Sequence, residues 1–425
     1  MIPGNKEKVL FLNECKRLAL KKEHDSWDAR EILKKARSTV CTVNTVTNHF
    51  PKESNTCKMI NKVRKDSRSR PPKKDGSDIL DFEFLLDRLP EEVPRDFYRG
   101  DVTSLYKGVT YRHFLFMSEV GRKVLRDTKF LLVDATFQIC QKPHEQLLTI
   151  HAQVKRSEDG VRVNMPVAFA LMHNRSESAY KAVFQKIKDI VEEDGSSLRV
   201  KEFIVDYEKA IWNALRAVFV NAHVRGCWFH FCQCIIRKAR ELELTDAFFN
   251  HNRVHKMLKR LMCLHLIDKN NIPTLFDELK WKYRNQIRDT PGVKALFEYF
   301  ETQWIQGRGA AGFKPEDYSC FGQPIRTTNI VESWNSSIYK AGKRKKHDIY
   351  QLAILLAREN ARCEDNVAQY GAKKYKRRRQ VEKEKGIKKA YDVYDTNLKL
   401  WELLERLREA TTNTIRYPIA VDEQE

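Results

Sequence analysis

Three acidic residues, Asp134, Asp206 and Glu332, stand where carboxylates could serve a metal site that cuts phosphodiesters. Asp134 follows the apolar run 130–133 and Asp206 follows the apolar run 203–205, so each lies where a buried strand is predicted to end. Glu332 lies near the start of a predicted helix. Carboxylates that are far apart in the sequence can still converge in the fold.

Carboxylates from two strand ends and one helix suit divalent cations that prefer oxygen ligands, namely Mg²⁺ or Mn²⁺. Two such ions about 3.5–4 Å apart can activate water on one side of a phosphodiester and stabilise the leaving oxygen on the other. Each residue also has a structural alternative, because an Asp after a strand is often a turn former or a helix cap.

The helix predicted around Glu332 has both a start signal and an apolar pattern. Thr328 or Asn329 can cap its first turn. Its apolar positions, Ile330, Trp334 and Ile338, recur at helical spacing. We therefore expect Glu332 on the polar face of a helix that packs against the rest of the protein.

Cys227 and His230 form a Cys-x-x-His pair at the end of a strand predicted near 223–229. Structural zinc sites normally use four ligands in two spaced pairs, and no clean second pair follows. Two interpretations stay open: a Zn²⁺ site, or buried packing, which is favoured because free Cys is among the most buried residue types.

The apolar patterns predict an α/β fold with a mixed sheet. The expected elements are strands at about 129–136, 145–154 and 163–171, a helix at about 177–193, a strand ending at Asp206, a helix at about 208–219, the strand near 223–229 and a helix through Ile235 and Ile236. The first three strands are expected to form an antiparallel meander. The first and fourth strands are expected to be neighbours, which would bring the two aspartates together.

The length and the changes in composition predict several segments. These are a helical N-terminal segment that ends in an exposed basic linker at 64–76 (1–80 in all), the first part of the sheet core (81–240), an α-helical insertion (241–320), the closing helix of the core with Glu332 (321–370), and a basic, helical C-terminal tail (371–425). Aromatic residues of the insertion, including Trp281 and Trp304, are expected in its own core. Stacking on DNA bases is the alternative. The leucines of the last helix are expected to dock onto the chain itself.

The chain carries 78 Lys and Arg against 57 Asp and Glu, a net charge of +21, which favours a polyanionic partner. The cations predicted to bind nucleic acid follow Glu332 in two clusters: Lys343, Arg344, Lys345 and Lys346, then Lys373, Lys374, Arg377, Arg378 and Arg379. Phosphate contacts of this kind give affinity without sequence choice. A solvated basic face or a nuclear-import signal is the alternative, and the expected location is the nucleus.

No run of about 18–20 apolar residues exists and no signal peptide is apparent, so an intracellular protein without a membrane span is expected. The ten cysteines show no regular spacing, which favours a reducing compartment.

Several motifs resemble the catalytic domain of Mutator-like element (MULE) transposases. They are FLLVDATF at 130–137, QLLTIH at 146–151, MPVAFAL at 165–171, SESAY at 176–180, FIVD at 203–206, GCWFH at 226–230 and TNIVE at 328–332. The resemblance implies an RNase H-like (retroviral-integrase-like) core with a DDE triad at Asp134, Asp206 and Glu332. It also implies cutting and joining of DNA strands with Mg²⁺ or Mn²⁺, and leaves open a homo-oligomer on DNA.

The zinc finger that precedes this domain in related transposases is not found, since Cys41 and Cys57 with His24 and His49 lack its spacing. Two alternatives therefore stay open. One is a transposase-derived module that binds DNA or protein without catalysis, and the other is an RNase H-like nuclease. The intact carboxylates favour activity.

Overall fold

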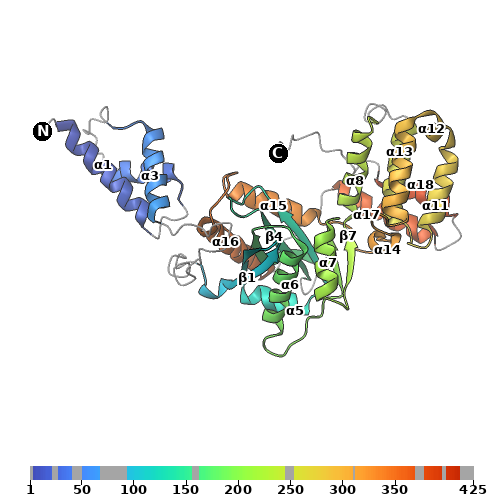
Figure 1. Ribbon diagram of the computed structural model, residues 1–425, viewed down its shortest axis with the longest axis horizontal. Helices are drawn as coiled ribbons and strands as arrows, with labels where there is room; N and C mark the ends of the chain where they lie inside the picture. The colour runs from blue at the N-terminus through green and yellow to red at the C-terminus, as the bar shows by residue number, and fades with distance from the viewer. Residues whose placement is uncertain are drawn as a thin grey trace. The chain divides into compact units, whose positions relative to one another are not determined.

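A computed structural model describes residues 3–21, 27–40, 50–67, 93–155, 162–244, 253–309, 312–368, 378–394 and 399–411. It contains a seven-stranded sheet in the order β1-β2-β5-β4-β3-β6-β7, with many helices (Figure 1). The chain divides into two compact units. The first comprises residues 1–128, 135–198 and 333–368, and the second comprises residues 129–134, 199–332 and 369–425.

The sheet is mixed, which confirms the predicted α/β class. The strands that pair antiparallel are β1 (Tyr98–Tyr106), β2 (Val109–Phe116), β5 (Arg162–Met172) and β4 (Gln146–Lys155). The strands that pair parallel are β3 (Phe130–Thr136), β6 (Glu202–Val205) and β7 (His223–Gly226). The first and fourth predicted strands, β3 and β6, are neighbours as expected.

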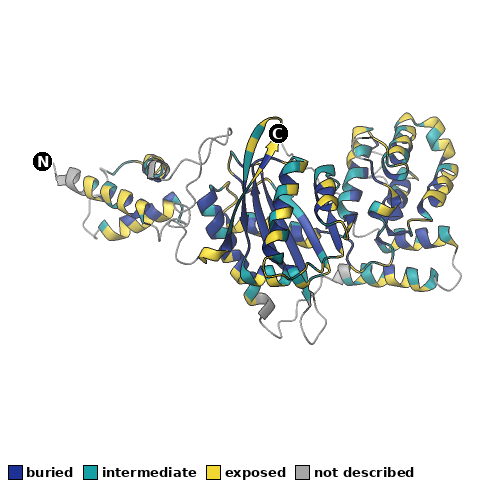
Figure 2. Ribbon diagram, turned by 60° about the horizontal axis from the view of Figure 1, so that its bottom comes forward, coloured by how far each residue is buried: buried dark blue, intermediate teal, exposed yellow. Residues whose placement is uncertain are grey.

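Helices pack on both faces of the antiparallel strands, since alternate residues of each strand point to opposite faces of the sheet. Leu147, Phe169 and Leu171 belong to one apolar cluster with Trp334 and Ile338. Gln146, the residue before Leu147 in β4, points to the opposite face of the sheet, where its side-chain amide donates to the Tyr180 hydroxyl. Helices α15 (Asn329–Ala341) and α16 (Ile349–Ala368) contribute to this apolar cluster. Helices α5 (Glu119–Asp127) and α6 (Glu177–Glu192) make the other helix contacts with the antiparallel strands. The short helix η3 (Arg95–Phe97) precedes β1. Figure 2 shows the strands as mostly buried.

The N-terminal segment is helical, as predicted. Its helices are α1 (Pro3–Leu20), α2 (Ala29–Val40) and α3 (Glu53–Ser67), and they share a core of their own. Arg64, which the sequence placed in an exposed linker, lies in α3 and is buried, where its guanidinium donates to the carbonyls of Ala19 and Trp27. Residues 65–67 of that linker also lie in α3, and residues 68–76 lie outside the described residues.

The second unit is helical beyond its three strands. Its helices are α7 (Lys209–Val218), α8 (Trp228–Glu241), α10 (Arg253–Cys263), η4 (Leu264–Leu266), α11 (Ile272–Lys282), α12 (Arg284–Asp289), α13 (Pro291–Phe300), η5 (Glu301–Ile305), α14 (Pro315–Tyr318), α17 (Arg378–Tyr394) and α18 (Leu400–Thr411). The last helix packs on α10 and α17, so its leucines dock onto the chain itself, as expected. None of the helices in the described ranges is long and apolar enough to cross a membrane.

One aromatic prediction for this unit holds and another is wrong. Trp304 is 1% exposed and packs against Tyr207 and Phe231. Trp281 is 69% exposed, because it lies near the end of α11 on the side away from the buried residues of that helix, and the Arg284 guanidinium stacks on it. Its large apolar surface made it look like a core residue in the sequence.

Four histidines of the first unit make the fold sensitive to acid. Burial lowers the pKa of His113 and His151 to about 3, and it also lowers the pKa of His144 and His173. These imidazoles are neutral in the folded protein but bind protons below about pH 6.5 once the chain unfolds. Stability is therefore complete above that pH and falls as the pH drops toward 3.

When the pH drops from about 7 to about 5, we expect the free energy of unfolding to fall by about 2 kcal/mol for each of His113 and His151. Urea unfolding at the two pH values measures this. The variant His151→Gln should show a smaller difference between them. An equal difference in the variant would mean that other groups cause the acid sensitivity.

Candidate active site

Asp134 lies in β3, and Asp206 directly follows β6, the neighbouring parallel strand. The register pairs Leu131 with Phe203 and Leu132 with Ile204, and each aspartate stands two residues further along its own strand direction. Residues two apart in a strand share a face, and neighbouring strands lie about 4.7–4.9 Å apart. Asp134 and Asp206 therefore project from the same side of the sheet, next to Leu132 and Ile204.

The helix that carries Glu332 packs onto that same side. Val331 is fully buried in a cluster with Leu132, Ile204, Cys227 and Ile325. α15 begins after Thr328, whose carbonyl accepts the amides of Val331 (2.7 Å) and Glu332 (3.1 Å). The predicted helix start is confirmed. Its buried face differs from the prediction, because Val331 replaces Ile330, which is 39% exposed.

His230 lies between two of the carboxylates. Its Nε2 is 3.2 Å from Oε1 of Glu332, and its Nδ1 is 3.9 Å from Oδ1 of Asp206. Neither contact has hydrogen-bond geometry, so Nδ1 of His230 and Oε1 of Glu332 are buried polar atoms without a hydrogen-bond partner among the described residues. The sequence offered His230 as a zinc ligand or as buried packing, and neither interpretation predicts this position.

The electrostatics show that the carboxylates influence one another. Burial, together with the charges of Asp134 and Asp206, raises the pKa of Glu332 to about 7, while the His230 charge opposes this rise. Burial opposes a charge on His230, but nearby Cys227, Asp206 and Asp134 hold the pKa of the imidazole well above its ordinary value. The imidazole thus supplies a positive charge among three acids.

Local contacts fix Asp206 in place. The Trp212 indole donates to the Asp206 carbonyl (2.7 Å), and the Tyr207 amide donates to the Asp206 carboxylate. Gly226 at the end of β7 leaves room for the Tyr207 ring, since a Cβ there would approach that ring to 2.2 Å. These contacts hold the carboxylate at the strand end.

The donor set fits Mg²⁺ in kind. Three carboxylates supply oxygen ligands, and Glu332 has a buried oxygen without a hydrogen-bond partner among the described residues. In the part of the chain that the structure describes, no three His, Cys, Asp or Glu side chains stand close enough as arranged to hold an ion. The imidazole of His230 separates Glu332 from Asp206, so the carboxylates would have to close together to share one.

The two residues of the Cys-x-x-His pair have different surroundings. Cys227 is fully buried, and its sulfur accepts two hydrogen bonds from Thr328. Cys232 and Cys234 lie further along α8, and the His223 side chain is 54% exposed beside Glu202. Among the described residues these groups do not form a set of metal ligands.

The first cationic cluster forms a fixed loop after α15. Lys343 and Arg344 adopt left-handed backbone conformations, with φ of 56° and 55°. His347 closes the loop through its Nε2 on the Gly342 carbonyl (2.8 Å) and its amide on the Ile139 carbonyl (2.9 Å). All four cations, Lys343 to Lys346, are exposed.

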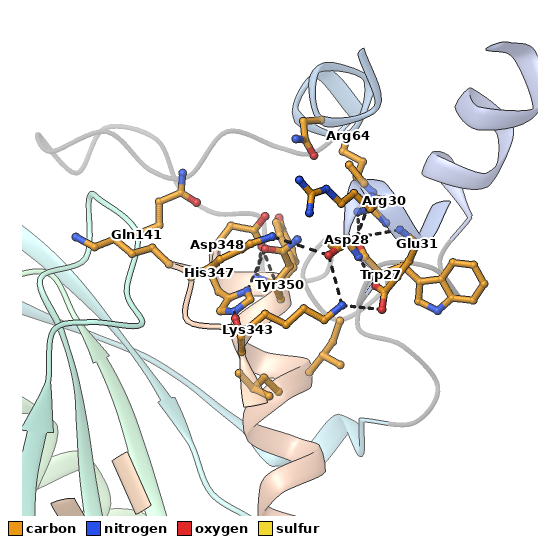
Figure 3. Close-up of a pocket in the computed structure, with 18 of the residues that line it drawn as sticks. Trp27, Asp28, Arg30, Glu31, Arg64, Gln141, Lys343, His347, Asp348 and Tyr350 are labelled. Carbon is orange, nitrogen blue, oxygen red and sulfur yellow. Dashed lines mark hydrogen bonds and ion pairs between the residues drawn. The ribbon is translucent and has the colours of Figure 1, made fainter. Parts of the chain in front are cut away.

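Two acidic residues, Glu31 in α2 and Asp28 just before that helix, contact this loop (Figure 3). Nζ of Lys343 is 2.6 Å from Glu31 and 3.5 Å from Asp28, and Nζ of Lys345 is 3.9 Å from Asp28. In the second cluster, Lys373, Lys374 and Arg377 lie outside the described residues. Arg378 and Arg379 begin α17.

A comparison with protein families agrees with the motifs. Residues 130–234 match the family model for the MULE transposase domain, a stretch that includes Asp134, Asp206 and His230 and ends before Glu332. A search of curated proteins finds no match. This part of the chain is therefore similar to the transposase domain of Mutator-like elements.

Proposed function

We propose that this chain, as a Mutator-like transposase, cuts and joins DNA strands at Asp134, Asp206 and Glu332. The observation that supports the proposal most is the meeting of Asp206 and Glu332 at one imidazole, although the two acids are far apart in the sequence and the family match ends before Glu332. The parallel pairing of β3 and β6 and the order of the strands support an RNase H-like core.

Each residue has a distinct task in the proposed reaction. Asp134, Asp206 and Glu332 would hold Mg²⁺, which supplies Lewis-acid activation of water or of a 3′ hydroxyl when bound. His230 balances the negative charge of the carboxylates, because its imidazole is held in the protonated form.

Metal affinity should depend on pH through Glu332. Its carboxyl has a pKa of about 7, so below that pH a proton competes with the metal. We expect the apparent affinity for Mg²⁺ or Mn²⁺ to fall about tenfold for each pH unit below 7, and to level off above pH 8. Calorimetric titration with Mn²⁺ across this range measures it. A flat profile would remove Glu332 from the ligand set.

The cationic loop is the proposed contact to the DNA backbone. A phosphate that binds Lys343 has to replace Asp28 and Glu31. The variant Asp28→Asn with Glu31→Gln should therefore bind duplex DNA about two- to fivefold more tightly, since exposed ion pairs are worth about 0.2–1 kcal/mol. The double variant keeps the side-chain cap of α2, because Asp28 accepts the amides of Arg30 and Glu31 through an oxygen that Asn retains.

A matched control removes the same charge elsewhere in the N-terminal helices. Glu14→Gln with Glu53→Gln affects residues whose ion pairs are with Arg17, Arg30 and Arg37. Fluorescence anisotropy with one labelled duplex compares the two variants. Equal affinities of the two would show that total charge, and not the contact with the loop, controls binding.

A further inference from the structure

Cys227 connects the two elements that present Asp206 and Glu332. It precedes α8 and is fully buried. Its amide donates to the carbonyl of Val205 (2.8 Å), the last residue of β6 before Asp206. Its sulfur accepts the amide (3.2 Å) and the hydroxyl (3.3 Å) of Thr328.

Thr328 carries this connection into the helix of Glu332. It is fully buried, and its carbonyl accepts the Glu332 amide at 3.1 Å. One short path of hydrogen bonds therefore runs from Val205 through Cys227 and Thr328 to Glu332. Around it, Leu132, Ile204, Ile325 and Val331 exclude water.

The sulfur suits this position because of its size and its surroundings. A thiol sulfur is a weak hydrogen-bond acceptor. It therefore holds the amide and the hydroxyl of Thr328 best where water cannot compete for these donors. The substitution Cys227→Ala would leave no side-chain atom within reach of Thr328, whose buried amide and hydroxyl would lose this partner. The start of α15 would then be free to shift away from the end of β6.

We propose that Cys227 is a positioning residue, whose thiol sets the separation between the carboxylates of Asp206 and Glu332. The proposal rests on the proposed function for its effect on metal binding, but the structural link itself can be tested without metal. His230, in the first turn of the helix that Cys227 precedes, is placed between the same carboxylates by this arrangement.

The first experiment is metal-free hydrogen exchange of the full chain. In Cys227→Ala, the Thr328 and Glu332 amides should exchange at least about tenfold faster than in the wild type, because the acceptor of the Thr328 amide is gone. In Cys227→Ser the hydroxyl is again an acceptor, and most of the protection should return. Unchanged exchange in Cys227→Ala would overturn the proposal.

The second experiment is calorimetric titration with Mn²⁺. Residues that orient metal ligands typically contribute about 10–100-fold to metal affinity, so Cys227→Ala should weaken binding within that range and Cys227→Ser should restore most of it. Thr328→Val added to Cys227→Ala should weaken it little more, because both changes break one link.

Cys263→Ala is the matched control. It removes another fully buried thiol of the same unit, whose partner is Thr411 on α18. It should lower the melting temperature while leaving the Mn²⁺ affinity and the Thr328 amide unchanged. If it weakens Mn²⁺ binding as much as Cys227→Ala does, Cys227 contributes only to general packing and the proposal is wrong. If the wild type binds no Mn²⁺ while the exchange result holds, the proposed function fails and the structural link stands.

Discussion

Replacing Asp134 by Asn is expected to lower the rate of metal-dependent DNA strand cleavage by more than about 100-fold, which is the upper end of what changes around a metal's ligands cost. The substitution removes the charge of a proposed ligand on β3 and keeps its size. DNA affinity should change by less than about twofold, because the cationic loop is untouched. A cleavage assay with Mg²⁺ and an anisotropy measurement on the same preparation give the two results.

Asp189→Asn is the control for this variant, since it removes the same charge from an exposed position on α6. It should cleave DNA like the wild type. A wild-type protein that binds DNA but never cleaves it, over a range of Mg²⁺ and Mn²⁺ concentrations, would instead support a transposase-derived binding module without catalysis.

The second large effect concerns salt. If about six to ten phosphates are contacted, DNA affinity should fall by about 10³–10⁵ between about 50 and 200 mM salt, because bound counterions are released. Neutralising Lys343, Arg344, Lys345 and Lys346 together should weaken binding to all duplexes about equally and reduce the salt dependence. Competition between a chosen duplex and scrambled DNA at fixed salt tests this, and a strong preference for one sequence would contradict it.

The strands that present the aspartates could be predicted because they are continuous apolar runs. Residues 131–133 of β3 and all of β6 are buried, so their sequences indicate the strands. β6 ends directly before Asp206 as expected, whereas β3 continues past Asp134 to Thr136. β1 and β2 were not predicted. β1 is the edge strand of the sheet and mostly accessible, with Leu105 65% exposed, so it has no apolar pattern to detect.

The boundary at Cys227 shows a second limit of the sequence. A strand was predicted to run to about 229, but β7 ends at Gly226 and α8 begins at Trp228. The run Cys-Trp-Phe-His is apolar enough for a strand, and the tertiary contacts of Cys227 with Val205 and Thr328 decide for a helix start. Those contacts come from residues distant in the sequence.

The position of His230 was missed for a related reason. The Cys-x-x-His spacing was the available signal, since three residues correspond to nearly one helical turn. It left open a Zn²⁺ site beside the favoured interpretation of buried packing, and neither interpretation placed His230 among the carboxylates. In the fold, the same spacing buries Cys227 beneath α15 and places His230 beside the acids.

The most direct test of the carboxylate site is anomalous diffraction at the manganese edge from crystals of the protein soaked in Mn²⁺. We expect a manganese peak contacted by carboxylate oxygens of Asp134, Asp206 and Glu332, with the His230 imidazole displaced from between Asp206 and Glu332. Manganese bound elsewhere, or a peak whose ligands exclude Glu332, would contradict the proposed active site.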